Sequence, residues 1–149
     1  MTRADIVELL KQGLFDQLKG AKETAWLECK ACPYLLDSEQ QKMEFAKDVS
    51  SMANGEGGLF LLGARTIKSQ LHQGEEISGV SPYNQDLVDP DRYHQVAEEW
   101  IYPRIPGLRI TWCPSKADPK KGIFAVEVPG GHAIGPFWFK KSFSTTERR

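Results

Sequence analysis

Two carboxylates separated by four residues, Glu23 and Glu28, are the side chains of this sequence best suited to chemistry. Two carboxylates that lie close together can hold a divalent metal, such as Mg²⁺ or Mn²⁺, that activates water or stabilises a phosphoryl oxygen. Asp48, about twenty residues further along, offers a third carboxylate. The alternative interpretation is that Glu23 or Glu28 forms a simple ion pair with Lys22 or Lys30. Unless this metal site exists, we expect no cofactor.

A second feature is the glycine-rich segment Asn54–Gly58, which leads into the apolar residues 59–62. Loops that bind nucleotide phosphates follow a strand and precede a helix, so that backbone N–H groups at the helix N-terminus meet the phosphate. Here a helical pattern comes first and the strand comes last, and no G-x-x-x-x-G-K-[S/T] occurs. The glycines therefore indicate a helix end that continues into a buried strand, and ATP binding is not expected.

The three cysteines, Cys29, Cys32 and Cys113, do not suggest a disulfide framework. Cys29 and Cys32 have the C-x-x-C spacing, but a structural zinc site needs four ligands and only Cys113 and scattered histidines remain to complete it. We expect buried or incidental thiols in a reducing compartment, the cytoplasm.

Aromatic and basic residues alternate near the C-terminus, in Trp138-Phe139-Lys140-Lys141. This combination suits single-stranded nucleic acid, because aromatic rings stack on bases and cations meet phosphates. The alternative is an amphipathic strand, with Trp138 or Phe139 in the core and the lysines in solvent.

Charge is distributed unevenly along the chain. Residues 1–100 hold 10 Lys and Arg against 17 Asp and Glu, a balance of −7, whereas residues 101–149 hold 9 against 3, a balance of +6. A basic end of this kind indicates a surface that follows phosphates, or else an unevenly solvated surface.

The elements that position these residues follow from periodicity. Apolar residues at three- and four-residue spacing predict a helix over 3–19, with Thr2 and Asp5 as its N-terminal capping pair and Gly20 as its C-cap. Period-two alternation predicts a strand over 24–30, in which Trp26, Glu28 and Lys30 share one face.

Capping signals predict two further helices. Ser38 followed by Gln41 indicates a helix that begins near residue 39 and ends at Asn54-Gly55, where both residues tolerate positive φ. Asp89-Pro90 begins a helix that reaches about residue 102. Residues 65–76 read as a hairpin or loop, and strands are expected over 77–80, 108–113, 122–128 and 136–143.

This order of elements predicts an α+β fold, a mixed, largely antiparallel sheet flanked by about three helices. At 149 residues the chain is expected to be one domain, with an N-terminal helix over 1–20 and a core over 21–146. No apolar stretch is long enough to span a membrane, and no secretory signal peptide is recognisable.

The ordered pattern of Glu23–Lys30, Ala46–Gly63 and the closing segment 138–145 resembles the Schlafen-type AlbA-like domain. This family, once called divergent ATPases, occurs in bacterial transcriptional regulators, RecG-helicase-related proteins and animal Schlafen proteins. The resemblance covers residues 20–146 and implies a mixed sheet with helices and a role in DNA or RNA binding. It also implies that the chain is a fragment of a longer protein with a C-terminal effector region.

Some Schlafen proteins cut RNA with two glutamates, which match Glu23 and Glu28 here, and a third acid after the second strand. The matching stretch Leu62–Thr66 contains no acid and places Arg65 there. We therefore expect a binding module rather than an enzyme, and a metal-dependent nuclease that uses Glu23 and Glu28 remains the alternative. A protein-interaction or homodimerisation domain is the second alternative.

The expected nucleic-acid interface has two kinds of residue. The cations expected to contact phosphates are Lys30, Arg65, Lys140 and Lys141, and the rings expected to stack on bases are Trp26 and Trp138. Contacts of this kind would be salt-sensitive and tolerant of sequence.

Overall fold

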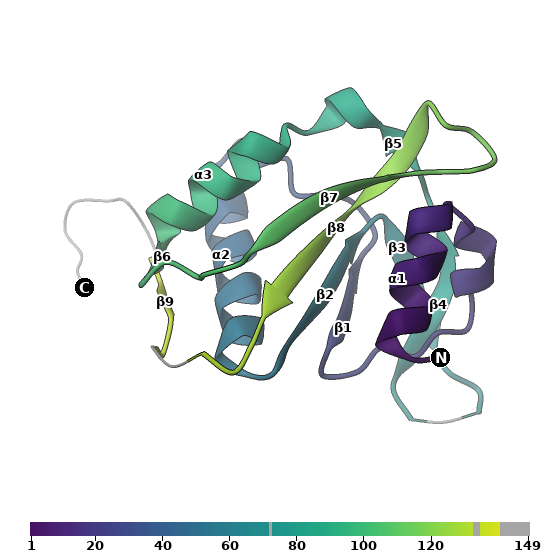
Figure 1. Cartoon of the computed structure of the whole chain (residues 1–149), viewed down its shortest axis with the longest axis horizontal. Helices are drawn as coiled ribbons and strands as arrows, with labels where there is room; N and C mark the ends of the chain where they lie inside the picture. The colour runs from purple at the N-terminus through teal and green to yellow at the C-terminus, as the bar shows by residue number, and fades with distance from the viewer. Residues whose placement is uncertain (72, 133–134, 141–149) are drawn as a thin grey trace.

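A computed structural model of the chain describes residues 1–71, 73–132 and 135–140. Figure 1 shows helices on both sides of a twisted sheet. The elements follow one another in this order: α1 (Arg3–Gln12), η1 (Phe15–Leu18), β1 (Leu27–Lys30), α2 (Glu39–Asn54), β2 (Gly57–Leu62), β3 (Ala64–Lys68), β4 (Glu75–Val80), β5 (Tyr83–Asn84), η2 (Gln85–Leu87), α3 (Pro90–Trp100), β6 (Ile101–Tyr102), β7 (Arg109–Pro114), β8 (Lys121–Pro129) and β9 (Trp138–Phe139).

The central sheet is mixed and largely antiparallel, so the predicted α+β fold is confirmed. β1 and β2 run parallel, with Glu28 opposite Phe60 and Lys30 opposite Leu62. β8 lies antiparallel to β2 on one side and to β7 on the other, and β5 pairs with the first residues of β8. α2 makes the crossover that a parallel pair of strands requires.

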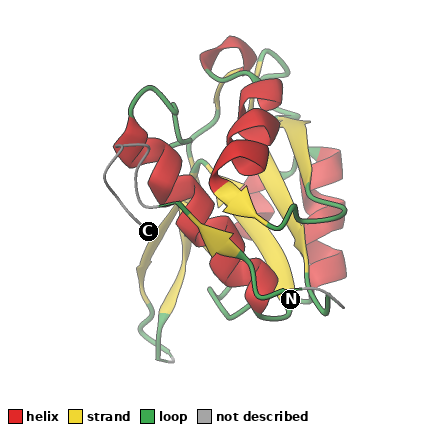
Figure 2. Ribbon diagram, turned by 90° about the vertical axis from the view of Figure 1, so that its left-hand side faces the viewer, coloured by secondary structure: helices red, strands yellow, loops and turns green. Residues whose placement is uncertain are grey.

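Each face of the sheet is covered by a different apolar layer. Phe60 and Leu62 of β2 belong to a buried cluster with residues of α2 and α3. Leu59 and Leu61, which alternate with them, belong to a second cluster with residues of α1 and η1. The continuous burial of β2 thus reflects two apolar faces. Figure 2 shows α2 and α3 from the side on which they cover the sheet.

The N-terminal helix is shorter than its periodicity predicted. The capping pair of Thr2 and Asp5 is confirmed, with both reciprocal hydrogen bonds present. However, the helix ends at Gln12, and Gly13, not Gly20, adopts the left-handed C-cap conformation at φ 72°. A Cβ at Gly13 would collide with the backbone of Pro114 and Lys116, so close packing against the end of β7 explains this glycine. The apolar pattern continues to Leu18 because η1 buries Phe15 and Leu18 in the same cluster.

The first strand also begins later than predicted. Thr24 and Leu27 form an isolated bridge across a tight turn, and β1 proper begins at Leu27. The alternation therefore does not extend back to Trp26, whose ring packs against the cluster on the α1 side. Lys30, in contrast, reaches Asp48 of α2 on the other side of the sheet. The prediction that Trp26 shares a face with Lys30 is wrong.

The second helix begins as predicted, because the Ser38 side chain accepts a hydrogen bond from the N–H of Gln41. Its end differs from the prediction. Gly55 has a φ of −94°, so the helix does not use positive φ there. Positive φ occurs later, at Gly57 and Gly58, where β2 begins. A Cβ at Gly58 would collide with the backbone of Trp26, which requires a glycine at this crossing.

The remaining elements largely match the predicted ranges. Asp89 is the N-cap of α3 and Pro90 its first residue, as predicted. Residues 64–80 form the β3–β4 hairpin, beside η1 and β1. Of the expected last strand over 136–143, the structure describes a pair of residues, Trp138 and Phe139, as β9. Within the described part of the chain, no helix is both long and apolar enough to cross a membrane.

Candidate nucleic-acid interface

The predicted carboxylate pair lies along the edge strand β1. The Glu23 carboxylate accepts a hydrogen bond from the backbone N–H of Cys29 at 2.9 Å. Glu28 is half-buried in the strand, and its burial, together with the negative charges of Glu23 and Asp48, raises the pKa of its carboxyl above the ordinary value. Lys30 opposes this shift of the Glu28 pKa. Glu23 and Asp48 thus both disfavour the charged form of Glu28.

Asp48 already has two partners. The Lys30 ammonium lies 3.3 Å from its carboxylate, and the Tyr34 hydroxyl donates a short hydrogen bond to the same oxygen. Burial first, and then this hydrogen bond to Asp48, raise the pKa of Tyr34 well above its ordinary value. Lys30 also lies 5.8 Å from the centre of the Tyr34 ring. Asp48, Lys30 and Tyr34 thus satisfy one another at the side of α2.

Among residues 1–71, 73–132 and 135–140, no three His, Cys, Asp or Glu side chains are grouped so that they could hold an ion. Arg65 is in β3, and its Nε donates to the Ser81 hydroxyl at 2.9 Å. Burial, and then the neighbouring Glu23 and Glu28, raise the pKa of the Cys29 thiol to about 12, which disfavours its reactive thiolate form.

Aromatic side chains gather instead at the opposite end of the sheet. β6 pairs antiparallel with β9, so that Tyr102 lies opposite Trp138 and Ile101 opposite Phe139. We call these strands, residues 101–102 and 138–139, the aromatic ribbon; it lies beside the C-terminal end of α3 (Figure 1). Tyr102 is 77% exposed and Trp138 66% exposed, whereas Phe139 packs against the core cluster. Of the two rings expected to compete for the core, Phe139 therefore contacts it and Trp138 faces solvent.

Asn54 holds the chain in front of the aromatic ribbon. Its side-chain amide donates to the carbonyl of Phe137 at 3.0 Å, and its amide oxygen accepts from the N–H of Phe137 at 2.7 Å. Phe137 itself is buried in the α2 side of the core. On the other side of β9, the N–H of Lys140 donates to the carbonyl of Trp100 at 2.8 Å. The ribbon is thus fixed by α2 at one end and by α3 at the other.

A groove of about 560 Å³ separates α2 from the aromatic ribbon. Trp138 and Phe139 line it from one side and Lys47 and Asp48 from the other. Lys30 does not line the groove itself, but it pairs with Asp48, which does.

The other predicted cations lie in different places. Lys140 is exposed and directly follows the aromatic ribbon, and Lys141 lies outside the described residues. Arg65 belongs to the β3–β4 hairpin, at the end of the molecule far from the ribbon (Figure 1). The turn before β8, with Lys120, and the start of β8 at Lys121 are also remote from it. The basic excess of residues 101–149 is therefore not gathered on one surface within the described part.

Two features of this region were not predicted from the sequence: the exposed ring of Tyr102 in the ribbon and the hydrogen bonds of the Asn54 side chain. Tyr102 was expected to end a helix, and nothing local distinguishes it from any other terminal residue. Asn54 was interpreted from its tolerance of positive φ, whereas its side chain binds Phe137, 83 residues away. Neither role has a local signal, because both depend on pairing with the C-terminal segment.

Comparison of the chain with protein-family models, with curated proteins and with solved structures gives no match. The two candidate regions of the chain are the carboxylates near β1 and the aromatic ribbon with its groove.

Proposed function

We propose that the chain is a nucleic-acid-binding module that takes single-stranded DNA or RNA on the aromatic ribbon. The observation that carries this proposal is the exposed cross-strand pair of Tyr102 and Trp138. Large rings exposed side by side on a strand pair are costly to leave in water and suit a flat ligand. Bases present such a flat π-face whatever their identity.

Charge beside the rings supports the same ligand. Lys140 directly follows β9, and Lys30 pairs with Asp48, which lines the opposite side of the groove. A backbone that follows the groove would meet one ammonium on each side, which places phosphates near cations while bases stack on the rings. The resemblance to Schlafen-type AlbA-like domains points to the same class of ligand.

The carboxylates at β1 would then have a supporting role. Asp48 pairs with Lys30, and the negative charge of Glu28 and Asp48 disfavours phosphates directly on β1. The strand would therefore bind along the groove and the ribbon.

Fluorescence anisotropy with labelled oligothymidylate of about twelve nucleotides, matched duplex DNA and RNA tests the proposal. Loss of one stacked base contact typically costs roughly 1–3 kcal/mol, so Trp138→Ala and Tyr102→Ala should each weaken single-strand binding about fivefold or more. Leu71→Ala is the matched control, since Leu71 is an apolar side chain 93% exposed at the far end of the molecule. Equal affinity of all three variants would contradict the proposal.

The same exposed rings would also suit a second copy of the chain. Size-exclusion chromatography with light scattering, at several protein concentrations, separates the two cases. We expect a mass that does not depend on concentration and that stays the same in Trp138→Ala. A dimer that dissociates in this variant, without oligonucleotide binding by the native chain, would establish the interaction domain instead.

A further inference from the structure

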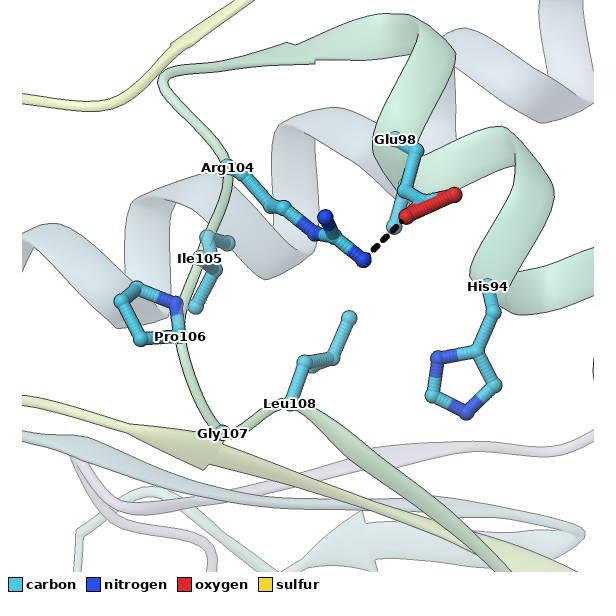
Figure 3. A pocket seen from close by; sticks show the side chains of 8 residues that line it. His94, Glu98, Arg104, Ile105, Pro106, Gly107 and Leu108 are labelled. Atoms are coloured by element: carbon cyan, nitrogen blue, oxygen red, sulfur yellow. Dashed lines mark ion pairs between the residues drawn. The ribbon is translucent and has the colours of Figure 1, made fainter.

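A second pocket, of about 420 Å³, lies next to the aromatic ribbon. α3 contributes His94, Ala97 and Glu98 to its lining, and the segment after β6 contributes residues 104–108. Figure 3 shows the Arg104 and Glu98 side chains meeting across the space, with Leu108 between them and the sheet and His94 further along the helix. Its volume lies within the range of small-ligand sites, about 300–1,000 Å³.

Glu98 and Arg104 form an ion pair across this pocket, at 2.5 Å between Oε1 and Nη2. The pair has no net charge, so an isolated anion or cation gains little there. Its hydrogen-bonding capacity is not exhausted, because guanidinium has five N–H donors and a carboxylate accepts at both oxygens. The pair therefore offers a row of donors beside a row of acceptors, which matches a neutral, flat ligand with the complementary pattern.

Among the bases, guanine has the pattern that satisfies both partners. Its O6 and N7 accept from the guanidinium of Arg104, which is the commonest specific contact of arginine with a base. Its N1–H and 2-amino group donate to the two oxygens of the Glu98 carboxylate. Adenine and cytosine offer the carboxylate one amino group, and thymine or uracil turns a carbonyl toward it. Guanine thus gains the most hydrogen bonds at this pair.

The pocket is also placed to receive a base from a strand on the aromatic ribbon. Arg104 follows Tyr102 by two residues, so their Cα atoms are at most about 7 Å apart. The apolar walls, Ile105, Pro106 and Leu108, suit the faces of a ring. A nucleotide next to one stacked on Tyr102 can therefore reach the pocket.

We propose that the pocket between α3 and residues 104–108 selects an unpaired guanine, read by Glu98 and Arg104; this inference rests on the proposed binding of single strands. The nucleic-acid interface then has a sequence preference, and Glu98 and Arg104 determine it. The ribbon supplies affinity, and the pocket supplies discrimination.

The test compares oligothymidylate of about twelve nucleotides with the same strand carrying one central guanine. A good bidentate pair discriminates by roughly 1–3 kcal/mol, so the guanine strand should bind about fivefold tighter or more. Inosine, which lacks the 2-amino group, and 7-deazaguanine, which lacks N7, should each lose part of this advantage.

Glu98→Gln should remove the preference for guanine while affinity for oligothymidylate stays within about twofold of that of Glu99→Gln. Glu99 is the matched control, since it is an exposed glutamate on the same helix that does not line the pocket and loses the same charge. If the native chain binds both strands equally, or if both variants lose the preference equally, the guanine pocket is wrong and the single-strand module stands. If no strand binds, both proposals are wrong.

Discussion

Replacement of Asn54 by alanine tests how the aromatic ribbon is held. The substitution removes both hydrogen bonds to the backbone of Phe137, at 3.0 and 2.7 Å. It leaves the rest of α2 intact, because Asn54 is its last residue and alanine is a good helix former. The N–H and C=O of Phe137, a buried residue, then have no side-chain partner on α2.

The magnitude follows from these two bonds. A net contribution of about 0.5–1.5 kcal/mol for each gives roughly 1–3 kcal/mol in all. The better helix propensity of alanine offsets up to about 0.7 kcal/mol of this loss of stability. Asn54 is itself exposed, so water reaches part of the site and replaces some of the lost bonding. We therefore expect a loss of about 1–2 kcal/mol in the free energy of unfolding.

Urea denaturation followed by circular dichroism measures this loss, and amide hydrogen exchange locates it. Exchange should accelerate most at two N–H groups: that of Phe137, which donates to the Asn54 side chain, and that of Lys140, which donates to the carbonyl of Trp100. Ser51→Ala is the matched control on the same helix face, with an expected change within about 0.5 kcal/mol. If Asn54→Ala is as stable as Ser51→Ala and exchange at Phe137 is unchanged, Asn54 does not hold the ribbon.

Four further predictions concern the site and its support. Lys140→Ala should flatten the slope of log K against log salt for single-strand binding by about 0.7, as expected for one phosphate contact, and an unchanged slope would place this lysine outside the interface. Glu28→Gln should raise the free energy of unfolding near neutral pH. The pKa of Glu28 in the folded state lies above its ordinary value of 4.5, so the native protein loses stability as pH rises through that region. Denaturation measured across pH should therefore show a flatter stability profile in the variant. The same variant, assayed with Mg²⁺ or Mn²⁺, should leave oligonucleotides as intact as the native chain does, whereas cleavage that it abolishes would establish the nuclease. Gly58→Ala should lower the free energy of unfolding by more than about 1 kcal/mol, because the added Cβ meets the backbone of Trp26. Gly55→Ala, where the atom nearest to the added Cβ is 3.6 Å away, should lower it less in the same denaturation assay.

Several parts of the fold could be predicted because their signals are local. Ser38 and Asp89 begin helices through hydrogen bonds to N–H groups two or three residues away. The glycines before β2 mark the change from helix to strand within a few residues. Such interactions depend on residues that are neighbours in the chain, so composition and spacing are sufficient to recognise them.

Where prediction failed, a distant segment decided the local conformation. The pattern of residues 3–19 looked like one helix, but close packing of Gly13 against residues 114–116 ends it early. Alternation placed Trp26 beside Lys30, but a turn at residues 24–27 sends its ring to the α1 side. A periodic pattern reports which residues are buried and does not report which layer buries them.

The sequence by itself determined the class of fold and the N-terminal caps of the three α-helices, because these rest on residue type and short spacing. Only the tertiary structure decided what lies together at the surface. Tyr102 meets Trp138 because β6 pairs with β9, and Asn54 binds Phe137 across 83 residues of chain. The exposed ribbon joins segments that are far apart in the chain, which no local pattern encodes.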